Sequence, residues 1–334
     1  MSKQITFDKV HTKEKQKLLK IKMNEVAELI HKRFSLKDKI NVCPVCASKM
    51  INFHVNKYGF NMDKCDECEH IFTNPFPSEE ALNFYYNSEL KQFENKFFED
   101  SFEDRVPIFT KRIEIINKLL TEGSILDVGS SIGIFIESLK RSGSQLNISA
   151  CDLNLESCQK LKDKYNDIEV IHKDVLKLDE EKKFEIVTLW DTFEHIVSPL
   201  ELLKKIHILL KPHGYFIFST PNTSSYEWKI MNKEHIQLLP PGHVNLYNKK
   251  NIKLFVEKMN FKVLDILTLN ASLDLTYIKK EINVLLNQNK INEQLSNYIS
   301  YQQSLLENPV IFESISSYLI DQREAGNMVV ILQK

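Results

Sequence analysis

Short apolar runs alternate with helical patterns between residues 107 and 270, and this alternation restricts the fold more than any other feature of the 334-residue chain. It is typical of a parallel sheet that is covered by helices on both faces. The expected strands are rich in Ile, Val, Leu or Phe and lie at residues 124–128, 146–151, 168–171, 184–190, 215–219 and 262–269. We therefore predict an α/β fold with a doubly wound, mostly parallel sheet.

The C-terminal part adds one more strand after a helical segment. Residues 271–325 contain no glycine and have a mostly helical pattern, and Gly326 and Asn327 then precede the apolar run MVVILQ. If that run pairs with residues 262–269, the sheet has seven strands and residues 271–325 form a helical insertion before the last strand. Insertions at a sheet edge often form lids, and plain packing is the alternative.

Composition excludes some classes of protein. The chain has 44 Lys and Arg against 45 Asp and Glu, so its net charge of -1 gives no global attraction to nucleic acid. No apolar run approaches the roughly 18 residues of a membrane span, which excludes a membrane-embedded protein. The first residues, MSKQITFDKVHTKEKQK, lack the apolar segment and cleavage site of a secretory signal, so we expect a cytoplasmic protein. Because disulfides are rare in the cytoplasm, the six cysteines need another explanation.

Four of the cysteines have the spacing of a zinc site. Two Cys-x2-Cys pairs, Cys43 with Cys46 and Cys65 with Cys68, are separated by eighteen residues. Each pair brings two thiolates together from a tight turn, and two pairs complete a tetrahedron, so we predict a structural zinc ion in a zinc ribbon at residues 41–75. Redox motifs of the Cys-x2-Cys type are the alternative. The other two cysteines are expected to be packing residues: Cys151 and Cys158.

Two charged segments flank the predicted zinc ribbon. Residues 1–40 carry eleven Lys and Arg against five acids. Apolar side chains recur there along one face of an expected helix: Leu19, Met23, Val26, Ile30 and Phe34. This basic amphipathic helical head is either a packed helix with a solvated lysine face or a surface that binds RNA or a membrane. Residues 76–106 contain eight acids and few basic residues, so we predict an acidic linker helix.

A glycine-containing turn joins the first strand of the sheet to the next helix. The segment runs from Ser124 to Gly133 and is followed by an apolar-periodic helix. Glycines in such a turn let a ligand approach the backbone, and the helix start offers free N–H groups. Gly129 and Gly133 stand four apart without a third glycine, which is not the dinucleotide fingerprint, and no Gly-Lys-Ser/Thr follows as in a phosphate loop.

Acidic residues lie at the ends of four consecutive strands. They are Asp127, Asp152, Asp174 and Asp191. The carboxyl ends of parallel strands share one edge of the sheet, where ligands bind. Four carboxylates at that edge suit a ligand with hydroxyls, an amino group and a positive charge, and they repel a pyrophosphate. Each acid has a second interpretation as the N-cap of a helix.

The ordered motifs of this region resemble a known family. The runs ILDVGSSIG, ACDLN, HKDVL and FEIVTLWDTFEHI are similar to the motifs of class I S-adenosylmethionine-dependent methyltransferases, which have a Rossmann-like sheet. The resemblance covers about residues 107–270 and 327–334, so we predict a methyltransferase domain over residues 107–334. The upstream runs CPVC, CDEC and HIFTNPFPSEEALNFYY resemble the zinc-ribbon head and linker of a subgroup often met in sugar-modifying and surface-polysaccharide pathways.

The resemblance implies a set of cofactor-binding residues. They are Asp127, Gly129, Ser131, Gly133, Asp152, Asp174, Val175 and Asp191. The turn after the first strand would hold the methionine end of S-adenosylmethionine, Asp152 would bind the ribose hydroxyls, and Asp174 with the Val175 backbone would meet the adenine edge. Ser131 stands where the family usually has a glycine, which strains the turn if that position needs a positive φ.

Candidate catalytic residues follow the fourth and fifth strands. They are Asp191, Glu194, His195 and His243. A hydroxyl acceptor must lose its proton, and His195 is a candidate general base, with His243 as a second candidate. The set also resembles the acid-x-x-Glu-His plus distant His that binds a divalent metal in small-RNA 2′-O-methyltransferases and, in part, in ubiquinone-pathway O-methyltransferases. A structural or substrate-orienting role is the alternative to a metal. Three aromatic residues near the same edge could stack on an acceptor or anchor loops: Tyr226, Trp228 and Tyr247.

Together these features predict a cytoplasmic S-adenosylmethionine-dependent methyltransferase with a zinc ribbon. The resemblance implies a sugar, a sugar nucleotide or a related small metabolite as acceptor. One alternative is an RNA methyltransferase, which the zinc ribbon and the basic head support. The other is a non-catalytic cofactor-binding or scaffolding protein of the same fold, which Ser131 supports.

Overall fold

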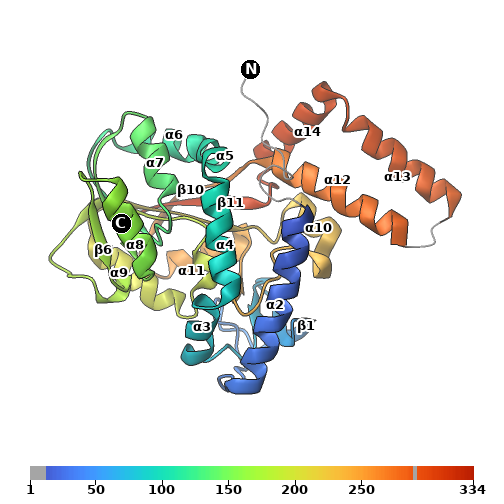
Figure 1. Ribbon diagram of the computed structural model, residues 1–334, viewed down its shortest axis with the longest axis horizontal. Coiled ribbons are helices and arrows are strands. Elements are labelled where there is room, and N and C mark those ends of the chain that lie inside the picture. Colours follow the sequence, from blue (N-terminus) through green and yellow to red (C-terminus); the bar gives the residue numbers. More distant parts are fainter. Residues whose placement is uncertain (1–12, 289–291) are drawn as a thin grey trace.

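A seven-stranded sheet forms the centre of the computed structural model, which describes residues 13–288 and 292–334 (Figure 1). The strand order is β10-β11-β8-β7-β4-β5-β6. The strands are β4 (Glu122–Val128), β5 (Gln145–Asp152), β6 (Glu169–His172), β7 (Phe184–Leu189), β8 (Leu210–Pro221), β10 (Lys262–Leu269) and β11 (Asn327–Gln333). The five neighbouring strands β6, β5, β4, β7 and β8 are parallel to one another. Strand β11 runs antiparallel to both of its neighbours, β8 and β10. The predicted doubly wound, mostly parallel sheet is confirmed, including the pairing of the last strand with residues 262–269.

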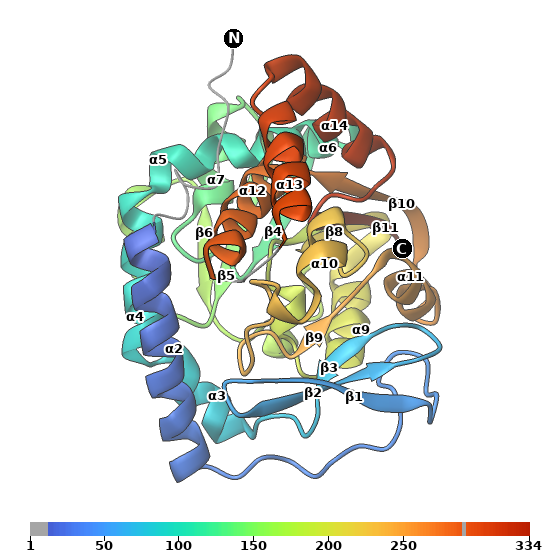
Figure 2. The same ribbon diagram turned by 90° about the vertical axis from the view of Figure 1, so that its right-hand side faces the viewer.

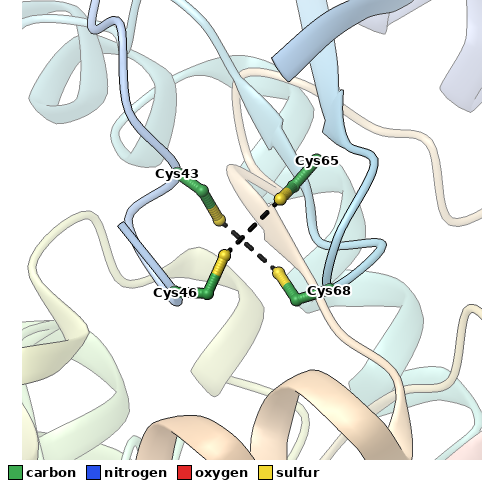
Figure 3. A group of neighbouring side chains, drawn as sticks. All are labelled: Cys43, Cys46, Cys65 and Cys68. Atoms are coloured by element: carbon green, nitrogen blue, oxygen red, sulfur yellow. Dashed lines mark hydrogen bonds between the residues drawn. The ribbon is translucent and has the colours of Figure 1, made fainter. Parts of the chain in front are cut away.

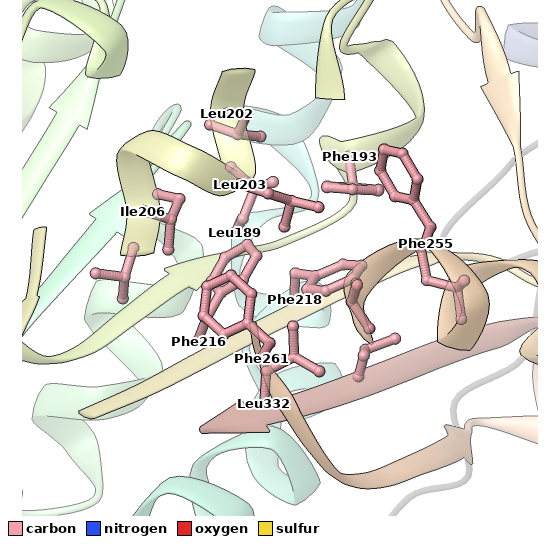
Figure 4. Close-up of a cluster of buried hydrophobic side chains, with 14 of the residues drawn as sticks. Leu189, Phe193, Leu202, Leu203, Ile206, Phe216, Phe218, Phe255, Phe261 and Leu332 are labelled. Atoms are coloured by element: carbon pink, nitrogen blue, oxygen red, sulfur yellow. The ribbon is translucent and has the colours of Figure 1, made fainter. Parts of the chain in front are cut away.

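Alternate residues of each strand pack against helices on opposite faces of the sheet. In β7, for example, Ile186 belongs to the core of one face and Val187 to the core of the other. One face is covered by α6 (Thr110–Leu119), α7 (Ile134–Arg141) and α8 (Leu155–Lys164), and the other by α9 (Pro199–Leu209) and α11 (Lys249–Glu257). Figure 4 shows the second core, in which leucines of α9 lie over phenylalanines of β8.

A second, four-stranded sheet has the order β1-β2-β3-β9. Its first three strands are β1 (Ile51–Lys57), β2 (Phe60–Cys65) and β3 (Ile71–Thr73), and all pairs are antiparallel. The fourth strand, β9 (Asn245–Leu246), comes from the segment between β8 and α11. The sheet of the cysteine-containing region is therefore completed by a strand from the C-terminal half of the chain, which the sequence pattern did not predict.

The N-terminal helices pack on this small sheet. In α2 (Lys13–Arg33), Met23, Val26 and Ile30 are buried, so the predicted apolar face is confirmed, whereas residues 1–12 of the predicted head lie outside the described residues. The prediction of one linker helix over residues 76–106 is wrong. That segment forms α3 (Glu79–Tyr86), α4 (Glu89–Asp100), α5 (Phe102–Arg105) and a 3-10 turn from Val106 to Phe109. The hydroxyls of Ser88 and Ser101 donate to the carbonyls of Tyr85 and Phe97, and such local hydrogen bonds compete with helix continuation.

The expected helical insertion is present before β11. It comprises α12 (Ala271–Gln288), α13 (Glu293–Leu305) and α14 (Pro309–Asp321), which extend from one side of the sheet (Figure 1). Leu275 of α12 packs with Phe312 and Leu319 of α14, and Tyr277 packs with Met231 of α10 (Tyr226–Met231). Within residues 13–288 and 292–334, no helix has the length and apolar character needed to cross a membrane.

We expect the Ile30→Ala substitution in α2 to lower the free energy of unfolding by about 2–5 kcal/mol, because it opens a cavity in a fully buried contact. Ile21→Ala in the same helix is the matched control, since Ile21 is 45% exposed and its truncation should cost no more than about 0.5 kcal/mol. Urea unfolding measures both. Equal effects would show that α2 does not pack as described.

Candidate functional site

The four cysteines of the predicted zinc ribbon converge on one point (Figure 3). Their sulfur atoms all lie within 4.8 Å of one another, with 3.6 Å between Cys43 and Cys68 and 3.5 Å between Cys46 and Cys65. A disulfide would require about 2.05 Å, whereas four sulfurs bound tetrahedrally to one zinc ion at about 2.3 Å lie about 3.8 Å apart. The donor set and its spacing therefore fit a closed four-cysteine metal site.

The two Cys-x2-Cys turns have the same local geometry. In the first, Ala47 N–H donates to the carbonyl of Cys43 at 2.9 Å, and in the second Glu69 N–H donates to the carbonyl of Cys65 at 2.9 Å. The residue after each second cysteine is left-handed, with φ of 64° at Ala47 and 62° at Glu69. This repeated turn directs both thiols of each pair to the same side of the backbone.

The second cysteine turn is attached to the methyltransferase-like part of the chain. The side-chain amides of Asn248 and Asn251 donate to the carbonyl of Cys68 at 3.5 and 3.2 Å, and both residues form the capping box that begins α11. Lys258 donates to the carbonyl of Val45 in the first turn at 3.0 Å. The start of α11 and the cysteine cluster therefore position each other.

The turn between β4 and α7 has a left-handed backbone at three positions. Gly129 and Gly133 have φ of 73° and 80°, and a Cβ at Gly133 would overlap Leu161. Ser131, where the family usually has a glycine, is also left-handed with φ of 48°. Its N–H donates to Asp152 Oδ2 at 2.7 Å, and this charge-assisted bond offsets a backbone strain of about 1–2 kcal/mol.

The acids at the strand ends lie along one edge of the sheet, as predicted, but they differ in burial. Asp127 is 1% exposed and accepts from the Thr188 hydroxyl at 2.8 Å, and burial raises its pKa to about 7. Asp152 accepts from the N–H groups of Ser131 and Asn154, and burial raises its pKa as well. Both carboxyls thus brace the turns themselves, and direct contact with a cofactor stays a prediction.

The N-cap interpretation applies to Asp174. Its side chain accepts from Leu176 N–H at 3.0 Å, and the 3-10 turn that it caps begins at Val175. Leu153, the residue after Asp152, is 71% exposed at the same edge. An exposed leucine directly after Asp152 provides an apolar surface that sequence reasoning did not single out.

Asp191 forms an ion pair with a buried arginine, which no sequence motif indicated. Its Oδ2 lies 3.1 Å from Nη2 of Arg112, and Arg112 on α6 is 3% exposed. Asp191 Oδ1 accepts from Ser219 at 2.8 Å and from Asn327 at 2.6 Å. Partial desolvation acts to raise the pKa of Asp191, but Arg112 and these two hydrogen bonds keep it below its ordinary value. The prediction that Asp191 is one of the metal ligands is therefore wrong, because its carboxylate faces Arg112, and the converging group contains only Glu194, His195 and His243.

Four buried polar atoms around this ion pair have no hydrogen-bond partner: Nε and Nη1 of Arg112, Nε1 of Trp190 and Oδ1 of Asn327. The Phe109 and Trp190 rings lie 4.5 and 5.0 Å from the guanidinium of Arg112 and restrict its orientation. Buried polar atoms are normally paired, so these four atoms are available to a polar ligand or to ordered water.

Glu194, His195 and His243 form a second possible metal-binding group, and one ligand atom from each lies within 4.8 Å of the others. Nδ1 of His195 lies 2.9 Å from the Gly242 carbonyl, and Nδ1 of His243 lies 2.9 Å from the Gln237 carbonyl. Because carbonyls only accept, both Nδ1 atoms carry a proton, and each neutral imidazole keeps a lone pair at Nε2.

Burial shifts the pKa values of all three side chains toward their neutral forms. It raises the pKa of Glu194 to about 8, with Asp191 adding to the effect, and lowers the pKa of His243 to about 4. The pKa of His195 is also held well below its usual value by burial and by His243. Two neutral imidazoles beside a carboxyl group are a donor set that suits a divalent cation.

The linker helices contribute a tyrosine that sequence reasoning did not identify. Tyr86 of α3 lies with its hydroxyl 3.2 Å from Nδ1 of His195. Its neighbour Tyr85 is buried against Gly242, where a Cβ would lie 2.5 Å from the Tyr85 hydroxyl. Gly242 therefore allows the loop that carries His243 to pack closely on α3.

Two of the three predicted aromatic residues are buried, whereas Tyr226 is only partly buried. Trp228 and Tyr247 are 6% and 0% exposed, which excludes them as open stacking platforms and favours the interpretation as loop anchors. Cys151 and Cys158 are buried in the sheet region, in agreement with the prediction that they are packing residues.

Comparison with known proteins agrees with this geometry. Residues 102–266 match the family model described as a methyltransferase domain. The ubiquinone biosynthesis O-methyltransferase of Acinetobacter baylyi is 30% identical over 132 residues, which cover 37% of this chain and 56% of that protein. The enzyme of the same name from Paraburkholderia xenovorans is 27% identical over 157 residues, 44% of this chain and 68% of that protein. The chain thus spans just over half the length of the first of these relatives.

Solved structures with a similar course of the chain include a SAM-dependent methyltransferase from Archaeoglobus fulgidus, with 17% identity and a TM-score of 0.45 over 71% of this chain and 98% of that chain. A coclaurine N-methyltransferase is 14% identical, with a TM-score of 0.44 over 70% of this chain and 71% of that chain. With the strand order described above, the match over residues 102–266 shows that this part of the chain has a Rossmann-like methyltransferase fold.

Proposed function

We propose that the chain transfers a methyl group from S-adenosylmethionine to a small, saccharide-like acceptor. The observation that supports this most is the set of unpartnered polar atoms around Arg112 and Asp191, at the edge of a methyltransferase sheet. An amino-acid end of a ligand, with a carboxylate and an ammonium, has the charges that complete this set. Arg112 would bind the carboxylate, and Asp191 with Oδ1 of Asn327 would bind the ammonium.

The other end of the donor would lie along the neighbouring strands. Asp152 at the end of β5 would bind the ribose hydroxyls, and Asp174 and Val175 after β6 would meet the adenine, with the exposed Leu153 against its ring. When bound, S-adenosylmethionine supplies an electrophilic methyl group. The chain supplies the fixed orientation, which accelerates an in-line transfer strongly.

We expect S-adenosylmethionine and S-adenosylhomocysteine, but not NAD, to raise the unfolding temperature, because a ligand at a hundred times its dissociation constant stabilises by about 2.7 kcal/mol. Arg112→Lys should weaken S-adenosylhomocysteine binding by about 10- to 100-fold, since a hydrogen bond to a charged group contributes about 1.5–3 kcal/mol. The exposed neighbour provides the control Lys111→Met, with unchanged affinity. A shift with NAD alone, or equal affinities of the two variants, would contradict the assignment.

At the acceptor side, the proposed ligands of a divalent cation are Glu194, His195 and His243. The support is geometric: three converging ligand atoms, and two imidazoles whose Nδ1 protons are held by main-chain carbonyls. A cation held there would lower the pKa of an acceptor hydroxyl. The relatives are named O-methyltransferases, which agrees with an oxygen acceptor. Tyr86 beside His195 would help to orient the acceptor.

A manganese titration followed by electron paramagnetic resonance tests this second site. We expect one Mn²⁺ ion to bind to the intact protein and none to the His243→Ala and His195→Ala variants, because each loses one of three ligands. The control is His207→Ala, a histidine of α9 outside the group. Zinc content is measured in the same samples, so that loss of metal from the cysteine cluster is not mistaken for the effect. Unchanged Mn²⁺ binding by His243→Ala would remove the cation from the proposal.

We also propose that the four cysteines bind one structural zinc ion. Their spacing and the two matching turns support zinc, and the hydrogen bonds to Asn248 and Asn251 make the start of α11 depend on the cluster. Because both turns pack against the methyltransferase domain, we do not propose that they bind RNA.

We expect one zinc per chain in protein purified without chelator. Cys68→Ser should lose the zinc and increase amide exchange at residues 243–248, because β9 pairs with the strand that follows this turn. Cys158→Ser, a buried cysteine outside the cluster, should retain zinc and leave exchange in that segment unchanged. Protein without zinc, or exchange that is equal in both variants, would disprove the structural role.

A further inference from the structure

Three polar side chains that the proposed reaction does not use lie together beside the start of β11. They are Glu227 of α10, His235 in the following loop and Asp274 in the first turn of α12. Figure 2 shows α10 and α12 close to each other, and the packing of Tyr277 on Met231 confirms their contact. Glu227 and His235 are 3% and 4% exposed, whereas Asp274 is only half-buried and remains accessible from outside.

The two carboxyl groups approach each other across the backbone of Gly326. The N–H of Gly326 donates to Asp274 Oδ2 at 2.7 Å. A Cβ at position 326 would overlap Oε1 of Glu227 and lie 2.7 Å from Oδ1 of Asp274. The absence of a side chain at this position is therefore what allows both carboxyls to occupy one small volume.

Two atoms of this group are buried without a partner. They are Oε2 of Glu227 and Nε2 of His235, and Nε2 of His235 lies 3.7 Å from Oε1 of Glu227, too far for a hydrogen bond. The N–H of Gln237 donates to Nδ1 of His235 at 3.1 Å, so Nδ1 is the acceptor and the neutral ring carries its proton at Nε2. The group thus offers two carboxyls and one N–H donor to a ligand.

Within the part of the chain that the structure describes, no Lys or Arg forms an ion pair with Glu227 or Asp274. Burial raises the pKa of both carboxyls, and the proximity of Glu227 raises that of Asp274 further. Two adjacent carboxyls without a cation cannot both ionise readily at neutral pH. A bound cationic group would stabilise both as carboxylates.

This group lies next to the proposed donor site. Gly326 contacts Asp274, and the next residue, Asn327, donates to Asp191, which pairs with Arg112. The two groups are therefore connected through consecutive residues at the start of β11, Gly326 on the side of Asp274 and Asn327 on the side of Asp191. The group of Glu227 and Asp274 is a suitable place for part of the methyl acceptor.

We propose that Glu227, Asp274 and His235 form an acceptor subsite that binds a protonated amino group and an adjacent hydroxyl, as in an amino sugar. The ammonium would lie between the two carboxylates, and the hydroxyl oxygen would accept from Nε2 of His235. This inference rests on the proposed function, because it places the subsite on the acceptor of that reaction.

Calorimetric titration with three related probes tests the subsite: glucosamine, N-acetylglucosamine and glucose. We expect the intact protein, saturated with S-adenosylhomocysteine, to bind glucosamine at least tenfold more tightly than the two uncharged sugars. Glu227→Gln and Asp274→Asn should each remove this preference, because an amide cannot neutralise an ammonium. The control is Asp321→Asn, an exposed carboxylate at the end of α14 in the same insertion, which should keep the preference.

The same samples separate the two proposals. Binding of S-adenosylhomocysteine shows that a variant is folded and tests the donor site, which none of these substitutions contacts. If either variant unfolds, the other still provides the comparison. Equal binding of the three sugars by the intact protein, or a preference that survives both substitutions, would overturn the subsite while leaving the donor site in place. Failure of S-adenosylhomocysteine to bind any sample would overturn the proposed function, and titration without it would still test the subsite.

Discussion

The pairing of β9 with β3 is the contact on which the arrangement of the proposed active site depends. Phe72 pairs with Asn245, and Thr73 N–H donates to the carbonyl of Val244, the residue that follows His243. Val244 N–H in turn donates to the carbonyl of Glu194. One short strand therefore connects the cysteine-containing sheet to two of the three residues in the proposed cation site.

A buried aromatic layer supports the same connection. His70 lies between Phe72 and Tyr247, and its Nε2 contacts Oδ1 of Asn245 at 2.9 Å. Tyr247 also packs on Phe193, directly before Glu194. Cys43, Cys65 and Cys68 belong to the same buried core as Phe193 and Tyr247. The N-terminal region is thus part of the scaffold of the site rather than an independently attached module. A loss of order at the cysteines would therefore change the position of His243.

The polar groups in and near the proposed site differ in whether they have hydrogen-bond partners within the protein, and this difference bears on ligand binding. Asp127, Asp152 and Asp174 have protein partners and define the shapes of turns. Arg112 and Glu227 keep buried atoms without partners. Because an unpaired buried polar atom is costly, a polar ligand that pairs with the atoms of the second class would stabilise the folded chain.

Local periodicity was enough to predict the seven strands, the insertion and the apolar face of α2, because each is encoded in adjacent residues. The strand-end acids were visible for the same reason, since their position depends on topology alone. Arg112 could not be found in this way, because its partner Asp191 is 79 positions away and no motif marks an arginine on a helix. Tyr86, 109 positions from His195, and the two-residue β9 likewise acquire their roles only through long-range contacts.

The late arrival of β9 affects how the chain assembles during synthesis. Strand β3 ends at Thr73 and its partner begins at Asn245, so a ribosome that adds about 5–20 residues per second leaves the edge of β3 unpaired for about 10–30 s. An unpaired strand edge is a template for association with other chains. The cysteine turns on both sides of β1 and β2 emerge before this interval, so early metal binding would order the small sheet and limit such contacts until the C-terminal half closes it.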